Sequence, residues 1–290
     1  MSGPVDAVDP PAASAAPAAS GSLADVRRIR VHHLQAAKDR GERWAMLTAY
    51  DAQVAGLFDR AGIPVLLVGD SVGTTVLGRA TTVGVTVDEM ALFGAAVAGA
   101  VKRALVVLDL PFGSYESGPA QALATAVELM KRTGAGAVKL EGGASRAASI
   151  AALVDAGIPV MGHVGFTPQH EHALGGYRVQ GRGDAGARVA ADAAALAAAG
   201  AFAVVLEMVP GEVAAQVSTA LGVPVVGIGA GPGTDAQVLV WTDLAGLTSG
   251  RVPTFVRRYA ELGTGLTAAV GRYAADVADG SFPGAAETFD

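Results

Sequence analysis

Residues 61–70 read AGIPVLLVGD, and the first half of this stretch recurs twice further along the chain. The later copies are AGIPV at 156–160 and LGVPV at 221–225. Each copy places a glycine where a helix would end, a proline at the entry to a strand, and then a valine. Because the same helix-to-strand junction is reused, the sequence indicates a βα unit repeated along the chain.

Apolar runs that fit buried strands alternate with helical patterns over most of the sequence. The predicted strands are 44–49, 64–69, 104–110, 137–141, 158–164, 202–208, 224–229 and 237–241. The predicted helices between them are 51–61, 86–101, 118–133, 145–156, 185–199 and 211–221. Such an alternation is typical of a parallel sheet covered on its outer face. Eight strands predict an α/β fold, a closed (β/α)8 TIM barrel, with a doubly wound open sheet as the alternative.

Two further segments flank the repeated units. Residues 22–40 have helical spacing and end at Gly41, so we expect an N-terminal helix that caps the bottom of the barrel. Residues 252–279 are predicted to be helical again. Residues 1–21 are rich in Ala, Pro and Ser and are predicted to be a disordered tail, which leaves 22–290 as one barrel domain.

The composition excludes several classes of protein. With 51% hydrophobic and 17% charged residues among 290, the chain can bury a large core. Its net charge of −6 argues against a nucleic-acid partner. The absence of cysteine excludes disulfides and thiolate metal sites, and fits a cytoplasmic protein. We expect no signal peptide, because residues 1–21 carry Asp6 and Asp9 and have no basic start or strong apolar core. We expect no membrane span, because Lys102 and Arg103 interrupt the most apolar region.

Polar side chains recur where the predicted strands end. These strand-end residues are Asp70, Ser71, Asp109, Lys139, Glu141, His163 and Glu207. A single acid at a strand end is most often a turn residue, but turns do not explain so many ends. In a barrel all of these ends lie on one face, where barrel active sites are found. The pattern therefore predicts an active site on that face.

Three of the acids suit a metal ion. Asp70, Asp109 and Glu141 offer only oxygen ligands, which favours a hard cation such as Mg²⁺ over Zn²⁺. Lys139 and Glu141 are two residues apart, so they point to the same side of their strand. A purely structural Lys–Glu pair is the alternative for these two.

The remaining candidates are harder to assign. Glu207 stands alone in the apolar run VVLEMVP, which suits a general base, although a structural acid is the alternative. His163 lies at a strand end, and its role stays open. His170 and His172 have tempting spacing for a metal, but loop histidines without further ligands are more often solvated.

Several motifs together carry a resemblance to a known family. They are LTAYD (47–51), LLVGDS (66–71), DLPFGSYE (109–116), VKLEGG (138–143), GHVGFTPQ (162–169), LGGYRVQGRGD (174–184), LEMVP (206–210) and GIGAG (227–231). In this order, over about 200 residues, the chain resembles the 3-methyl-2-oxobutanoate (ketopantoate) hydroxymethyltransferases.

The resemblance implies a barrel of the phosphoenolpyruvate/pyruvate type, assembled as a homodecamer. It implies hydroxymethyl transfer from 5,10-methylenetetrahydrofolate to 3-methyl-2-oxobutanoate, a step of pantothenate biosynthesis, with one Mg²⁺ per subunit. By motif, Asp70, Asp109 and Glu141 match the metal-site acids. Asp70 and Ser71, together with Asp109 and Lys139, match the oxoacid-binding positions, and Glu207 matches the proton acceptor.

The sequence departs from the family pattern in two loops. Residues 78–84 lack the usual acid and proline, and 170–172 read His-Glu-His instead of Ser-Val-Asn. Two other functions therefore stay open. One is an Mg²⁺-dependent oxoacid lyase on the same barrel, although the isocitrate lyases of that group use a cysteine that this chain lacks. The other is a non-catalytic paralogue that only binds an oxoacid.

Overall fold

Eight parallel strands form a closed barrel in the computed structural model, which describes residues 21–250 and 252–289. The strands are β1 Trp44–Thr48, β2 Val65–Val68, β3 Leu105–Asp109, β4 Ala137–Glu141, β5 Val160–Gly165, β6 Ala203–Glu207, β7 Val225–Ile228 and β8 Ala236–Leu239. They follow one another in sequence order, and β8 pairs back with β1. The predicted (β/α)8 barrel is therefore confirmed, and the open-sheet alternative is wrong.

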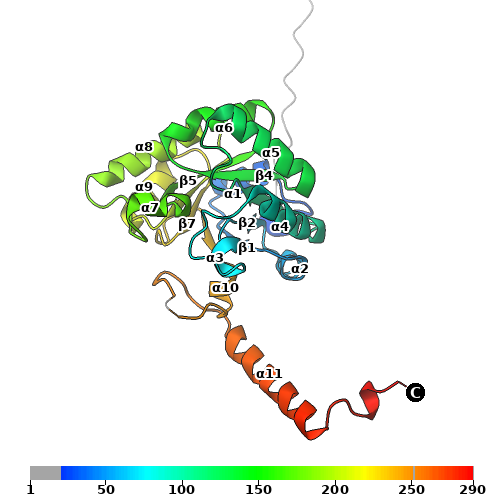
Figure 1. Ribbon diagram of the computed structural model, residues 1–290. Helices are drawn as coiled ribbons and strands as arrows, with labels where there is room; N and C mark the ends of the chain where they lie inside the picture. The colour runs from blue at the N-terminus through cyan, green and yellow to red at the C-terminus, as the bar shows by residue number, and fades with distance from the viewer. Residues whose placement is uncertain (1–20, 251, 290) are drawn as a thin grey trace, which may run out of the picture.

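The helices that connect the strands surround the barrel (Figure 1). They are α2 Ala52–Arg60, α4 Val87–Ala100, α5 Pro119–Thr133, α6 Ala147–Asp155, α8 Ala185–Ala198 and α9 Gly211–Ala220. Short helices that the sequence did not indicate follow three strands, at α3 Val72–Thr75, α7 Glu171–Leu174 and α10 Trp241–Leu244. Short 3₁₀ turns lie at Leu23–Asp25, Ala144–Arg146, Pro168–His170 and Ala285–Glu287. Because α3, α7 and α10 follow β2, β5 and β8, they shape the face where the strands end.

The N-terminal segment closes the bottom of the barrel, but its helix is shorter than predicted. Helix α1 spans Val31–Asp39, whereas the chain from Val26 to Arg30 is not helical. The backbone N–H of Ile29 donates to the Arg103 carbonyl at 2.8 Å, which holds this part out of a helix. Leu23, Ile29 and Leu34 join the buried cluster that fills the barrel from below. The predicted tail, apart from Gly21, lies outside the described residues.

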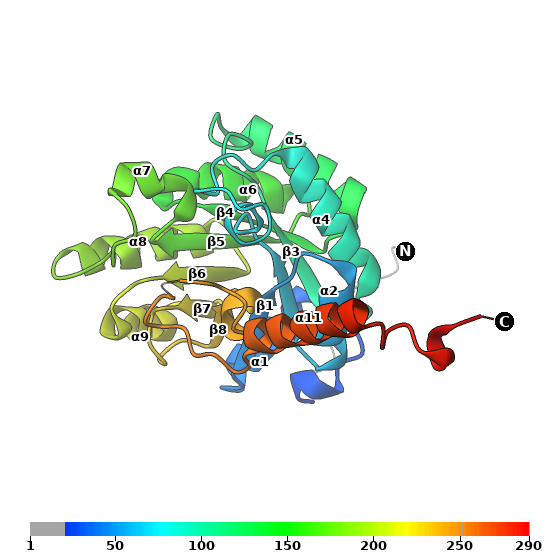
Figure 2. The same ribbon diagram turned by 60° about the horizontal axis from the view of Figure 1, so that its bottom comes forward.

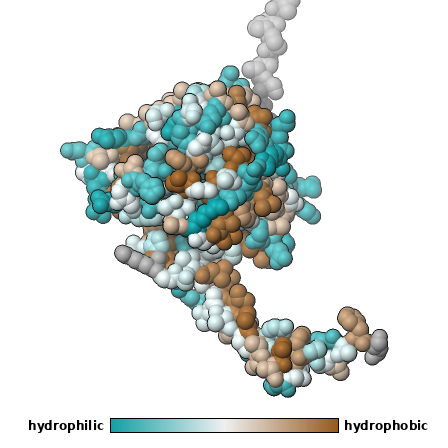
Figure 3. All heavy atoms as spheres, viewed as in Figure 1, coloured by the Kyte–Doolittle hydropathy of each residue, from teal (hydrophilic) through white to brown (hydrophobic). Residues whose placement is uncertain are grey.

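The C-terminal helix begins ten residues later than predicted. Helix α11 spans Leu262–Asp279, while Pro253 to Glu261 form loops in which Tyr259 N–H donates to the Leu244 carbonyl. Proline at 253 lacks the N–H that a helix would use. Figure 1 shows α11 projecting from the barrel, Figure 2 shows it in front of the barrel after the turn, and Figure 3 shows apolar residues along it. None of its residues is buried.

The barrel interior and its outer layer are separate apolar clusters. Side chains that point inward, such as Met46, Leu67, Val107, Met161 and Val205, belong to the interior cluster. The other strand residues pack outward against the helices. Since successive strand residues alternate between the two faces, the next inward position on each strand lies two residues further on. Among the described helices, none combines the length and apolar character needed to cross a membrane.

Candidate active site

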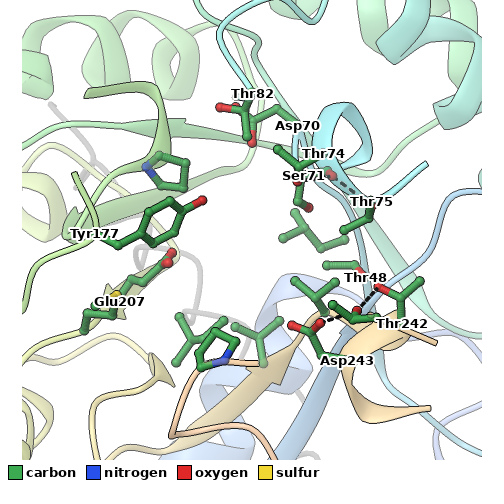
Figure 4. Close-up of a pocket in the computed structure, with 18 of the residues that line it drawn as sticks. Thr48, Asp70, Ser71, Thr74, Thr75, Thr82, Tyr177, Glu207, Thr242 and Asp243 are labelled. Atoms are coloured by element: carbon green, nitrogen blue, oxygen red, sulfur yellow. Dashed lines mark hydrogen bonds between the residues drawn. The ribbon is translucent and has the colours of Figure 1, made fainter. Parts of the chain in front are cut away.

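A cavity of about 910 Å³ opens where the strands end. All seven strand-end residues singled out from the sequence line it: Asp70, Ser71, Asp109, Lys139, Glu141, His163 and Glu207. Figure 4 shows Asp70 and Ser71 facing Tyr177 and Glu207 across this space. The structure thus brings the predicted residues into one site, as barrel topology requires. Their individual roles remain predictions.

Strand alternation explains why these side chains point inward. Val107, Met161 and Val205 fill the barrel interior, and Asp109, His163 and Glu207 follow each of them by two residues. The same relation links Ala137 to Lys139 and then to Glu141 on β4. On β3, β5 and β6 the apolar inward face therefore continues into one polar residue at the mouth, and on β4 into two. Because alternate residues of a strand face the same side, these polar residues form the floor of the cavity above the apolar interior.

Lys139 is the buried cation of the cavity. Its Nζ lies 2.7 Å from Asp109 Oδ1 and 3.7 Å from Glu141 Oε1. Burial alone would lower the pKa of Lys139, but the charges of Asp109, Glu141 and Asp70 outweigh burial and raise this pKa above its ordinary value. Lys139 therefore stays protonated and places a positive charge at the floor of the site.

The acids outnumber this cation. Burial and then repulsion from Glu141 and Asp109 raise the pKa of Asp70 to about 7. Burial also raises the pKa of Asp109, despite the ion pair with Lys139. The site thus holds more carboxylate than its own lysine can neutralise, which is the electrostatic setting that a cation relieves.

His163 connects two of the acids. Its Nδ1 lies 3.3 Å from Glu141 Oε1, and its Nε2 lies 3.3 Å from Glu207 Oε2. Burial and Lys139 act to lower the pKa of His163, but hydrogen bonds to Glu141 and Glu207 raise it to about 9. The imidazole therefore links the acids of β4 and β6, and its Nδ1 also lies 3.3 Å from Lys139 Nζ. This contact gives a physical reason for a histidine whose role the sequence left open.

Two residues that sequence reasoning did not assign hold the acids in place. The Gln169 side-chain amide donates to Asp70 Oδ2 at 2.9 Å and to the Leu110 carbonyl at 3.0 Å, and its carbonyl oxygen accepts from the Tyr115 hydroxyl. The Gln169 backbone N–H donates to Glu141 Oε2 at 3.0 Å. Both Gln169 and Tyr115 fall within the motifs quoted above, which was the only signal for them.

The backbone is strained directly after Glu207. Met208 has a φ of 48°, the single positive value among the described non-glycine residues. Its N–H donates to the Ile228 carbonyl at 2.8 Å, and its carbonyl accepts from the Gln180 N–H at 2.9 Å. Left-handed backbone at a non-glycine residue persists only when neighbouring bonds hold it, and it is concentrated at functional sites. These bonds fix where β6 ends and so where Glu207 points.

The donor set suits Mg²⁺ better than a metal that needs a full protein cage. Within the described parts of the chain, no three acidic or histidine side chains converge closely enough to enclose an ion. Mg²⁺, however, is commonly held by one or two carboxylates together with water and substrate oxygens. Asp70 and Asp109 provide buried carboxylates, and the Asp109 Oδ1 atom is paired with Lys139 Nζ at 2.7 Å. Glu141 is turned towards His163 and the Gln169 backbone instead.

The two loops that depart from the family pattern differ in their relation to the cavity. Arg79, Ala80 and Thr82 line it, and the Arg79 guanidinium is bound to the Glu89 carboxylate and donates to the Gly84 carbonyl at 2.9 Å. His170 and His172 do not line the cavity. The first loop can therefore contact a ligand in the cavity directly, whereas the two histidines of the second loop cannot.

Solved structures similar to this chain share its fold. Phosphonopyruvate hydrolase in complex with oxalate and Mg²⁺ superposes with a TM-score of 0.57 at 15% identity, covering 89% of this chain and 92% of that one. The 2,3-dimethylmalate lyase, a member of the PEP mutase/isocitrate lyase superfamily, also gives 0.57, at 18% identity, covering 90% and 91%. At these identities the likeness concerns the fold alone.

Other proteins resemble this chain far more in sequence than these solved structures do. The 3-methyl-2-oxobutanoate hydroxymethyltransferase of Acidothermus cellulolyticus is 59% identical over 92% of this chain and 99% of its own length. That of Mycobacterium ulcerans is 56% identical over 94% of this chain and 92% of its own. Residues 28–285 match the ketopantoate hydroxymethyltransferase family as a whole. The chain is therefore an enzyme that belongs to the ketopantoate hydroxymethyltransferase family.

Proposed function

We propose that the protein transfers a hydroxymethyl group from 5,10-methylenetetrahydrofolate to 3-methyl-2-oxobutanoate, with Mg²⁺ in the site and Glu207 as the base. The observation that carries this proposal is the position of Glu207. Its carboxylate enters the same cavity as Asp70, Asp109 and Lys139 but from β6, and His163 orients it through a 3.3 Å contact. An oxoacid held by Asp70, Asp109 and Lys139 would present its carbon 3 to the Glu207 carboxylate across the cavity.

Asp70 and Asp109 would hold the Mg²⁺, and Ser71 would contact the oxoacid carboxylate. The Ser71 hydroxyl lies 2.7 Å from the Tyr50 hydroxyl, which fixes its direction. When bound, the metal supplies a Lewis acid for the keto oxygen and carboxylate of the substrate. Lys139 adds a fixed positive charge near the oxygen on which negative charge collects.

Glu207 takes the proton from carbon 3, and the electron pair of that C–H bond moves to form the enolate. Carbon 3 of the enolate then bonds to the methylene carbon of the folate as the first of the two carbon–nitrogen bonds of that carbon breaks. Water replaces the second nitrogen and supplies the hydroxyl group, and the protons released by water and gained from solvent leave tetrahydrofolate with both nitrogens free of the one-carbon unit. Binding both substrates in one cavity makes the carbon–carbon step a positioned one. His163 keeps the Glu207 carboxylate aimed at carbon 3 during the proton transfer.

The proposal is tested by proton NMR in D₂O with the oxoacid and Mg²⁺, first without and then with the folate. We expect loss of the carbon-3 proton signal in the first case and ketopantoate in the second, both abolished by EDTA and restored by added Mg²⁺. The Glu207→Gln variant should remain folded, keep the carbon-3 proton signal and form no ketopantoate. Undiminished exchange in Glu207→Gln would refute the assignment of the base.

We further propose that the enzyme works as a homo-oligomer, and by the family resemblance as a homodecamer. Support comes from α11, whose apolar residues Leu262, Leu266, Val270, Tyr273 and Val277 recur at spacings of four, four, three and four. These residues lie on one side of the helix and are exposed in the single chain. A helix with such a face gains stability only when another surface covers it.

A further inference from the structure

The cavity extends beyond the acids to the side formed after β8. There it is lined by Val240, Thr242, Asp243, Leu247, Thr248 and Phe255. Figure 4 shows Thr242 and Asp243 at one side of the cavity and Asp70 and Thr82 at the opposite side. A five-carbon oxoacid bound near Asp70 would fill only a small part of 910 Å³. The region around Asp243 is therefore space for a second, larger ligand.

Asp243 is the only acid on this side of the cavity among the residues that the structure describes. Its Oδ1 accepts a hydrogen bond from Thr248 Oγ1 at 2.5 Å, which fixes the plane of the carboxylate. Within residues 21–250 and 252–289, no lysine, arginine or histidine forms an ion pair with it. The carboxylate is half-buried, and it faces the cavity as a charged acceptor.

The surroundings of Asp243 define the shape of the ligand that it can take. Leu247, Val240 and Phe255 are apolar and lie on the same side of the cavity. A carboxylate framed by apolar side chains suits a flat ring that carries two neighbouring N–H donors on one edge. Two parallel N–H···O bonds to one carboxylate are strong and directional, because the acceptor is charged.

We propose that Asp243 binds the pterin ring of the folate co-substrate through the 2-amino group and N3–H of that ring. This inference rests on the proposed function, which requires a folate in the cavity. The pterin carries these two donors on its pyrimidine ring, whereas the one-carbon unit is bonded to N5 on the other ring. Anchoring the first edge at Asp243 therefore leaves the one-carbon unit on the side of the ring that faces the remaining cavity, where Asp70 and Glu207 lie.

The test separates binding of the folate from chemistry on the oxoacid. We would measure the dissociation constant of tetrahydrofolate by fluorescence and, in the same preparations, the folate-independent exchange of the carbon-3 proton in D₂O. Asp243→Asn should weaken tetrahydrofolate binding by roughly 10- to 100-fold, the usual loss for a charged hydrogen-bonded pair. Its exchange rate should stay within about twofold of the parent, in line with a residue remote from the reacting carbon.

Two matched variants control this experiment. Asp184→Asn makes the same chemical change at an exposed position that does not line the cavity, and it should change neither quantity. Thr248→Val keeps the Asp243 charge but removes the hydrogen bond that orients it. It should weaken binding by a smaller factor, and it remains informative if Asp243→Asn does not fold.

A tetrahydrofolate analogue without the 2-amino group gives the sharpest readout. The parent enzyme should bind it more weakly than tetrahydrofolate, and Asp243→Asn should no longer distinguish the two. Two results would overturn the assignment of Asp243. One is a folded Asp243→Asn variant that still prefers tetrahydrofolate to the analogue by the same factor as the parent, and the other is an Asp243→Asn variant with unchanged affinity for tetrahydrofolate. A parent enzyme with neither exchange nor folate binding would instead overturn the proposed function, and with it this inference.

Discussion

Gln169 donates from its side-chain amide to the Asp70 carboxylate at 2.9 Å, although the two residues are 99 positions apart. The same amide group also contacts the Leu110 carbonyl and the Tyr115 hydroxyl. One buried side chain thus connects the loops that follow β2, β3 and β5. A buried amide with every partner satisfied holds these loops in a single arrangement, which the Asp70 position depends on.

Replacing Gln169 with Met should lower kcat/KM by at least tenfold and destabilise the protein. The variant keeps the volume of the side chain but leaves the Leu110 carbonyl without its partner, at about 1–3 kcal/mol, and removes one of the hydrogen bonds of the Asp70 carboxylate and of the Tyr115 hydroxyl. Steady-state kinetics and urea unfolding measure the two effects. Gln35→Met on α1, at the bottom of the barrel, should leave kcat/KM unchanged. Parent-like activity in folded Gln169→Met would contradict the role of this amide.

Replacing Gly165 with Ala should displace Glu207. Gly165 pairs with Glu207 across β5 and β6, and its φ is +94°. An added Cβ would lie 2.3 Å from the Glu207 carbonyl oxygen and 2.7 Å from a Val209 methyl, so the backbone that carries the proposed base must move. We expect a loss of at least 100-fold in carbon-3 exchange, because a misplacement of about 1 Å is sufficient for that loss.

Gly157→Ala provides the matched control for this prediction. Gly157 has a similar φ of +82°, but an added Cβ meets nothing within 4 Å. The Gly157→Ala variant should lose only about 1–2 kcal/mol of its free energy of unfolding, which is the strain of left-handed backbone at alanine. Its rate of carbon-3 proton exchange should be unchanged. If both variants lose activity equally, backbone strain rather than the contact with Glu207 is the cause.

The Arg79–Glu89 pair should make part of the stability depend on pH. Hydrogen bonds from Arg79 and then from the Thr86 N–H lower the pKa of Glu89 to about 2. Since this pKa lies below the ordinary value of 4.5, the stabilisation is complete above pH 4.5 and is lost as the pH falls towards 2. The Tm difference between the parent and Glu89→Gln should therefore be largest near pH 7 and shrink below pH 4.

Salt gives an independent check on the same pair. Both side chains are partly exposed, so 1 M NaCl should reduce the Tm difference at pH 7 by screening their attraction. A difference that depends on neither pH nor salt would mean that Glu89 stabilises α4 only through its hydrogen bond to the N–H of Thr86, the N-cap residue of that helix.

Helix α11 should be the element that holds the oligomer together. Leu266 is 61% exposed and Val270 is 56% exposed in the single chain. Replacing both with Glu places charges on the apolar face, so light scattering should show a smaller particle than the parent. Ala275 lies on the opposite side of α11, so the Ala275→Glu variant should form a particle of the same mass as the parent. A parent enzyme that is monomeric at micromolar concentration would refute the proposal.

The sequence by itself determined the barrel and the residues that line its mouth. Strand-length apolar runs separated by helical patterns specify a parallel sheet, and a period of two puts Asp109, His163 and Glu207 on the inward face. These are local signals, because each depends on residues a few positions apart. The predicted helices that failed in part, 22–40 and 252–279, are those whose ends depend on distant contacts with Arg103 and Leu244.

Only the tertiary structure decided how these residues act on one another. His163 bridges Glu141 and Glu207, Gln169 holds Asp70, and Asp243 faces the same cavity from the far side of the barrel. Each of these relations joins residues from different βα units, and closure of the sheet brings them within hydrogen-bonding reach or into one cavity. A sequence pattern records which face a side chain takes, whereas distances between units are set by the closed barrel.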